Sequence, residues 1–175
     1  MRERVTASRL LDFMRALGTE VRTDARVYLV GGATAVLLGW RDSTVDVDLK
    51  IIPDDEVLKC IPSLKEALKI NVELASPDDF IPEVPGWQER SQFIKREGKV
   101  DFFHYDLYMQ ALAKIERGHA MDINDVRQMI NRRLIDPKRL PEFFEMIASQ
   151  LYKYPAIDPT TFRKSIEKVI AENLK

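Results

Sequence analysis

The sequence contains one cysteine, Cys60, so no disulfide can form within the chain, and a reducing compartment suits it. It has no basic surplus, because 27 Lys and Arg side chains face 28 Asp and Glu side chains, for a formal net charge of −1. The overall charge does not indicate a nucleic-acid-binding protein, although a local basic patch would suffice for one. No apolar run approaches the roughly 20 residues of a membrane span, and the N-terminal region lacks a signal-peptide core. We expect a soluble cytoplasmic protein.

The composition is that of a globular chain. Its 175 residues are 45% hydrophobic and 31% charged, which is enough for one real core and a helical extension. Repeats and low-complexity tracts are absent from the sequence, which argues against a solenoid or a disordered protein. We expect an α+β fold in which a mixed β-sheet with flanking helices spans residues 1–104. A helical C-terminal part, residues 105–175, is expected to pack on that core.

Hydrophobic periodicity predicts the elements of the first part. Helices are expected at 5–17, where Gly18 is a plausible stop, at 33–39, where Gly39 ends the helix, and at 54–68. Strands are expected at 26–31, 44–52 and 70–74, with a hairpin formed by 91–95 and 99–104.

The second part reads as helices only. One helix spans 107–117 and ends at Gly118, and another spans 123–132. Asp122 is the expected N-cap of that second helix, with Asp125 at its third position as an acidic analogue of the capping box. Further helices are expected from Pro137 or Pro141 to about residue 151, and over 161–174.

Two carboxylates share one face of the strand predicted at 44–52. Alternation places Thr44, Asp46, Asp48 and Lys50 on one face, and apolar residues (Val45, Val47, Leu49 and Ile51) on the other. Ordinary solvent exposure would also produce polar positions there. However, Asp is depleted in strands, and neighbouring carboxylates repel one another unless a cation neutralises them. Oxygen ligands without His or thiolate suit Mg²⁺ or Mn²⁺, which also hold substrate phosphates.

A glycine pair precedes this strand. Gly31 and Gly32 follow the apolar strand at 26–31 and open the short helix at 33–39. A helix opened by glycines presents free N–H groups and the positive end of its dipole, which suits phosphate. A phosphate-binding turn beside metal-binding carboxylates indicates handling of a nucleoside triphosphate.

A third carboxylate would complete a two-metal site of the kind that supports in-line phosphoryl transfer. Glu73 and Asp101 are the candidates, because each lies mid-strand between apolar neighbours. We prefer Glu73, since its strand follows directly after the one that carries Asp46 and Asp48. Both alternatives stay open at this point.

The pattern of Gly31-Gly32 followed by Thr44-x-Asp46-x-Asp48 resembles the defining motif of the DNA polymerase β-type nucleotidyltransferase superfamily. The helical part is similar to a bacterial subgroup related to AbiEii-type toxins of toxin–antitoxin systems. That subgroup carries a Lys on one helix and Asp-x-x-Asp at the start of the next, which here would be Lys114, Asp122 and Asp125. The matching blocks span about residues 27–126.

The resemblance implies a role for each matching residue. Gly31 and Gly32 would contact the triphosphate, Asp46 and Asp48 would bind metal, and Lys114 would hold triphosphate oxygens. Two further nucleotide-binding residues are implied, Arg41 and Thr44. The subgroup often has Arg-x-Thr or Arg-x-Ser here, whereas this chain has one residue more between Arg41 and Thr44.

The implied activity is metal-dependent transfer of a nucleoside monophosphate from an NTP to an acceptor hydroxyl. The acceptors used across the superfamily include tRNA ends, protein side chains and small molecules, and a cognate antitoxin or another partner protein is also implied. A protein that keeps the fold but only binds or regulates is the alternative. The best basic cluster, Lys95-Arg96-Glu97-Gly98-Lys99, is a minor candidate for contacting a nucleic-acid acceptor.

Overall fold

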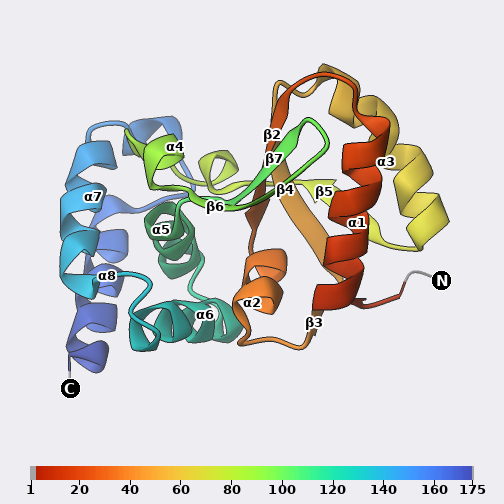
Figure 1. The fold of residues 1–175 in the computed structure, drawn as a ribbon. Coiled ribbons are helices and arrows are strands. Elements are labelled where there is room, and N and C mark those ends of the chain that lie inside the picture. Colours follow the sequence, from red (N-terminus) through yellow and green to blue (C-terminus); the bar gives the residue numbers. More distant parts are fainter. Residues whose placement is uncertain (1–2, 175) are drawn as a thin grey trace. The chain divides into compact units, whose positions relative to one another are not determined.

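The computed structural model describes residues 3–174, and their contacts divide into two compact units (Figure 1). Unit 1 comprises residues up to 76 together with 91–105, and unit 2 comprises residues 77–90 together with those from 106 onward. The chain therefore leaves unit 1 after Ser76, returns at Ser91 and leaves it again after Tyr105.

Unit 1 is built on a five-stranded mixed sheet with the order β5-β4-β2-β7-β6. The central strand β2 is antiparallel to β4 and parallel to β7, while β4 is parallel to the edge strand β5 and β6 is antiparallel to β7. A short antiparallel pair, β1 with β3, lies apart from this sheet. The strands are β1 (Val5–Thr6), β2 (Ala25–Val30), β3 (Ser43–Thr44), β4 (Asp46–Ile52), β5 (Asn71–Leu74), β6 (Gln92–Glu97) and β7 (Val100–His104).

One face of this sheet forms the core of unit 1 with helices α1 (Ala7–Glu20) and α3 (Asp55–Leu68), which lie beside each other in Figure 1. Alternate strand residues such as Leu29, Leu49 and Phe102 are fully buried on that face. The remaining alternate residues project from the opposite face, as the period of two requires. A third helix, α2 (Gly32–Leu38), directly follows β2.

Unit 2 is helical. Its α-helices are α4 (Trp87–Arg90), α5 (Leu107–Arg117), α6 (Ala120–Asn131), α7 (Leu140–Ala148) and α8 (Pro159–Asn173), with 3₁₀ turns η1 (Pro77–Asp79), η2 (Pro137–Arg139) and η3 (Leu151–Lys153). Buried aromatic residues hold the last two helices together, since Phe144 of α7 and Phe162 of α8 meet edge to face at 5.1 Å. None of these helices, nor those of unit 1, has the length and apolar character of a membrane span within residues 3–174.

These units confirm the expected fold class, an α+β architecture with a mixed sheet, flanking helices and a helical C-terminal part. The predicted helix over 107–117 is confirmed residue for residue, and Gly118 takes the left-handed conformation that ends it. Gly39 ends α2 in the same way.

Gly18 is not a helix stop, and that prediction is wrong. The residue lies inside α1, which continues to Glu20. A Cβ atom at this position would lie 2.5 Å from the carbonyl oxygen of Glu97, at the tip of the β6–β7 hairpin. Glycine is therefore required by the close approach of another backbone, a contact that local sequence does not report.

The strand predicted at 44–52 is also interrupted. Thr44 belongs to β3, β4 begins at Asp46, and Val45 between them is 57% exposed rather than buried on the core face. Thr44 is buried instead. The alternation holds from Asp46 onward, where Val47, Leu49 and Ile51 are buried and the intervening residues are half-buried.

Two predicted helix boundaries in unit 2 are wrong as well. In place of the single helix expected from Pro137 or Pro141 to residue 151, the chain forms helix α7 with a 3₁₀ turn on either side, η2 and η3. The last helix begins at Pro159 rather than at 161, because Asp158 accepts a hydrogen bond from the Thr160 N–H (3.3 Å) and caps it. Proline at the first helical position has no N–H to leave unsatisfied.

Candidate functional site

The carboxylates of β4 lie beside polar residues of the edge strand β5. In the parallel pairing of these strands, Asp46 is opposite Asn71 and Asp48 is opposite Glu73. Residues directly opposite each other project from the same face of a sheet. Asp46, Asp48 and Glu73 therefore share the face that does not form the core of unit 1, where the first two are half-buried and Glu73 is exposed.

Asn71 connects two of these side chains. Its Nδ2 donates hydrogen bonds to Asp46 Oδ1 (2.6 Å) and to Glu73 Oε1 (2.8 Å). The neutral amide thus keeps the two carboxylates together without removing their charge. Asn71 was not among the residues predicted from the sequence, although it precedes Glu73 by two residues and so shares its face.

The glycine pair lies next to Asp48. Val30, the last residue of β2, is opposite Asp48, so the chain turns at Gly31 beside this carboxylate. Gly31 has a φ of +60°, and a Cβ atom there would lie 3.5 Å from Asp48 Oδ2. Asp48 takes part in a polar interaction, while its Oδ1 atom is buried and accepts no hydrogen bond from the described residues.

Gly32 is packed against the chain that leads into β4. A Cβ atom at Gly32 would lie 2.1 Å from Thr44 Oγ1 and 3.5 Å from Arg41 Nη1. Thr44 in turn donates a hydrogen bond from Oγ1 to the Asp46 carbonyl oxygen (3.0 Å). Thr44 therefore joins the glycine turn to the acidic strand, with the Arg41 guanidinium alongside.

Asp101 does not lie beside Asp46, Asp48 and Glu73. It lies on β7, which is separated from β4 by β2, and it is opposite Arg26. Arg96 binds it in an ion pair of 3.0 Å. Of the two candidates for a third carboxylate, Glu73 is the one that the register places beside Asp48.

The side chains of Asp46, Asp48 and Glu73 can be compared with the ligands that Mg²⁺ or Mn²⁺ requires. Within residues 3–174, no three His, Cys, Asp or Glu side chains are gathered closely enough to enclose a metal ion. Asp46, Asp48 and Glu73 nonetheless offer only oxygen donors, from neighbouring strands and on one face, which is the ligand type that Mg²⁺ and Mn²⁺ prefer. The chemistry of these residues fits such an ion.

Comparison with known families gives one match. The model of the family described as nucleotidyltransferases of unknown function (DUF6036) matches residues 8–167. The chain belongs to this family. No curated protein and no solved structure matches significantly. The family match supports a general nucleotidyl-transfer role and a nucleotide substrate.

The two histidines of this chain lie in structural positions. Thr34 Oγ1 donates its single proton to the Leu29 carbonyl oxygen (3.1 Å), so it accepts from His104 Nδ1 (3.1 Å). Burial lowers the pKa of His104 to about 4, so the ring is neutral near pH 7. His119 is the N-cap residue of α6.

Unit 2 carries a buried charge cluster around Lys114. Lys114 Nζ lies 2.8 Å from Asp125 Oδ2 and 3.6 Å from Asp122 Oδ1, and all three residues are buried. Arg117 adds two hydrogen bonds to Asp122, at 2.8 and 2.6 Å. Although burial opposes it, hydrogen bonding to Arg117 and the charge of Lys114 hold the pKa of Asp122 below its ordinary value.

This cluster corrects the capping prediction. The helix α6 begins at Ala120, three residues earlier than expected, so Asp122 is inside its first turn and is not the N-cap. Asp125 is likewise not part of a capping box, because its carboxylate binds Lys114. Both aspartates face the preceding helix α5, where Lys114 and Arg117 are one turn apart.

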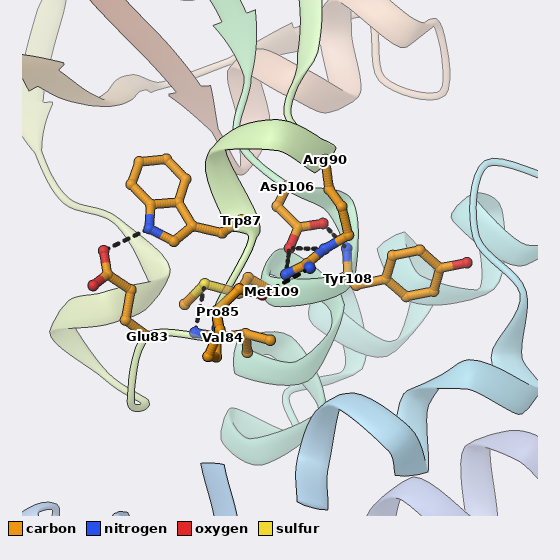
Figure 2. A network of polar contacts seen from close by, with 8 residues as sticks. All are labelled: Glu83, Val84, Pro85, Trp87, Arg90, Asp106, Tyr108 and Met109. Atoms are coloured by element: carbon orange, nitrogen blue, oxygen red, sulfur yellow. Dashed lines mark hydrogen bonds and ion pairs between the residues drawn. The ribbon is translucent and has the colours of Figure 1, made fainter. Parts of the chain in front are cut away.

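A second ion pair, between Arg90 and the buried Asp106, lies at the start of helix α5. Asp106 is its N-cap and accepts a hydrogen bond from the Tyr108 N–H (3.1 Å). Figure 2 shows Arg90 reaching the same carboxylate, with Nε at 3.0 Å and Nη2 at 2.8 Å from Oδ2. Burial raises the pKa of Asp106 despite the opposing hydrogen bond from Arg90. Arg90 also lies over the Phe143 ring, 4.5 Å from its centre.

Proposed function

We propose that this chain is a metal-dependent nucleotidyltransferase, which transfers a nucleoside monophosphate from an NTP to an acceptor hydroxyl. The observation that carries the proposal is the register of β4 and β5, which aligns Asp46, Asp48 and Glu73 on one face. Membership of the nucleotidyltransferase family supports the nucleotide substrate.

The acidic residues would hold the cation. Asp46, Asp48 and Glu73 would bind Mg²⁺ or Mn²⁺, which lowers the pKa of an acceptor hydroxyl and neutralises phosphate charge. Asn71 orients Asp46 and Glu73 through its two hydrogen bonds. In the reaction, the acceptor hydroxyl loses its proton to water and its oxygen forms a bond to the α-phosphorus. The bond from that phosphorus to the β-phosphate bridging oxygen breaks, and pyrophosphate leaves.

The glycine turn would bind the triphosphate. Gly31 has no side chain of its own to block the approach of a ligand to its backbone, and the Arg41 guanidinium beside Gly32 suits phosphate oxygens. Thr44 fixes this turn relative to β4. From the resemblance, Lys114 is a further candidate for triphosphate binding, with Asp122 and Asp125 as the carboxylates that hold its ammonium group.

A non-catalytic binding or regulatory protein is the second candidate. The observation that favours it is the bridging amide of Asn71, which already keeps Asp46 and Glu73 together without an ion. A toxin–antitoxin role in a bacterium, with an antitoxin as partner, is proposed from the resemblance alone.

Incubation with α-labelled NTPs separates these candidates. Purified protein would be mixed with Mg²⁺, labelled NTP and cell extract, and the RNA, protein and small-molecule fractions would then be separated. We expect label in one fraction, lost in Asp46→Asn/Asp48→Asn and retained in Asp101→Asn, a matched removal of a strand carboxylate. Equal labelling by wild type and the double variant would contradict the proposal.

A further inference from the structure

A basic surface follows helix α6 in unit 2. Between Arg132 and Arg139 the sequence has four basic residues and a single acidic one, Asp136, for a net charge of +3 over eight positions. The whole chain has a net charge of −1. The basic residues are Arg132, Arg133, Lys138 and Arg139, and all four are exposed. We call them the 132–139 surface.

One residue of this surface, Arg133, lines a pocket of about 400 Å³. Its lining includes Tyr108, Arg133 and Pro137. The Tyr108 hydroxyl is held in place by the Asp136 N–H, which donates to it at 2.9 Å. Arg139 lies over the Tyr108 ring at 5.3 Å and over Phe143 at 4.8 Å. The pocket therefore combines an ordered aromatic wall with a planar guanidinium group at its edge.

Arg133 has a backbone conformation that usually requires glycine. Its φ is +58°, and it occupies the C′ position of a Schellman motif, in which Leu134 N–H donates to Met129 O and Arg133 N–H to Ile130 O. Arginine there costs about 1 kcal/mol relative to glycine, although its charge near the helix C-terminus recovers part of this. Such an outlier in a pocket lining supports the hypothesis of a functional role for the side chain.

The hairpin cluster at 95–99 differs from this surface. There, Lys95 pairs with Glu97 at 2.8 Å, and Arg96 pairs with both Asp24 and Asp101 at 3.0 Å. By contrast, neither Arg133 nor Lys138 forms a side-chain ion pair within residues 3–174. In the hairpin cluster, Lys95 and Arg96 are thus paired with acidic neighbours. In the 132–139 surface, Arg139 pairs with Glu142 at 3.4 Å, whereas the charges of Arg133 and Lys138 are not compensated by an ion pair with any described residue.

We propose that the 132–139 surface binds single-stranded nucleic acid, with its basic side chains on phosphates and one nucleotide in the pocket beside Tyr108. Single strands are bound by basic tracks combined with aromatic or guanidinium planes on which bases stack. A pocket of this size is within the range that small ligands occupy. Binding here is independent of the proposed transfer reaction.

Fluorescence anisotropy with a short labelled RNA, and with a DNA of the same sequence, tests the inference in EDTA. We expect Arg133→Gly to weaken binding several-fold and to reduce the salt slope by about 0.7 per lost phosphate contact. The same variant should melt at an equal or higher temperature, because glycine suits the C′ position. Arg133→Lys should keep most of the affinity. A difference in affinity between the RNA and the DNA identifies which nucleic acid the surface binds.

Lys164→Glu is the matched control, since Lys164 is an exposed basic residue of α8 in the same unit. Lys138→Glu should weaken binding while Lys164→Glu should not. Unchanged affinity in Arg133→Gly, or equal loss in Lys164→Glu, would overturn the proposal. So would competition by polyglutamate as strong as that by RNA, which would indicate an acidic protein partner instead. Normal binding by Asp46→Asn/Asp48→Asn would separate this inference from the proposed transfer reaction.

Discussion

The two units of this protein differ in the groups that their carboxylates bind. In unit 2, Asp125 is fully buried and lies 2.8 Å from the Lys114 ammonium, while Asp122 binds both Lys114 and Arg117. In unit 1, Asp46 and Glu73 share only the neutral amide of Asn71; Asp46 is half-buried and Glu73 is exposed. The buried carboxylates of unit 2 are thus paired with cations, whereas Asp46 and Glu73 of unit 1 form no ion pair within residues 3–174.

The largest expected effect tests this comparison through stability. Lys114→Met would leave Asp125 buried without its nearest cation, and we expect the free energy of unfolding to fall by about 3–5 kcal/mol. Urea denaturation measures this loss. Combining Lys114→Met with Asp125→Leu should recover much of it, because well-packed apolar residues replace buried ion pairs at little cost.

Asp46→Asn is the matched change in unit 1. The asparagine keeps an oxygen that can accept from Asn71, and it removes one of the neighbouring negative charges. We therefore expect stability to stay within about 0.5 kcal/mol of wild type or to rise. A loss as large as that of Lys114→Met would show that Asp46 supports the fold, and the contrast between the units would fail.

A smaller effect concerns the buried, uncharged His104 of unit 1. Its pKa of about 4 in the folded chain is below the ordinary 6.5, so between these pH values only the unfolded chain binds the proton. Stability should therefore fall as pH falls from 6.5 towards 4, by about 3 kcal/mol in total. Denaturation at several pH values should show a flatter profile for His104→Gln, and parallel profiles would contradict this assignment.

The last prediction concerns the glycine turn. Gly32→Ala would bring a Cβ atom within 2.1 Å of Thr44 Oγ1, so we expect a loss of about 1–3 kcal/mol. Thr44→Ala should relieve part of that loss in the double variant, since it removes the nearer atom but leaves the Thr44 Cβ position 2.8 Å away. Thermal melting of both single variants and the double variant measures the coupling; strict additivity would contradict the packing argument.

Sequence predicted those features that depend on local pattern. The alternation of Asp46 and Asp48 with buried Val47 and Leu49 follows from the period of a strand, and the helix stop at Gly118 follows from its free φ. The fold class followed from the order of such segments.

Contacts between distant segments could not be predicted in this way. Glycine is required at position 18 because the backbone of Glu97 approaches closely. The Asp122 carboxylate binds Arg117 and Lys114 of the preceding helix and does not cap its own helix. The grouping of residues 77–90 with the C-terminal helices is also non-local. Asn71 has a role only once β5 is paired with β4, which the alternation of a single strand does not specify.

The central claim is that Asp46 and Asp48 bind a divalent cation together with an NTP, and a thermal shift measurement tests it most directly. Ligand at about a hundred times its Kd should add about 2.7 kcal/mol, which raises the Tm of a chain of this size by roughly 5–10 °C. We expect this rise with Mg²⁺ plus NTP in wild type and its absence in Asp46→Asn/Asp48→Asn. The same rise in both proteins, or none in either, would contradict the account.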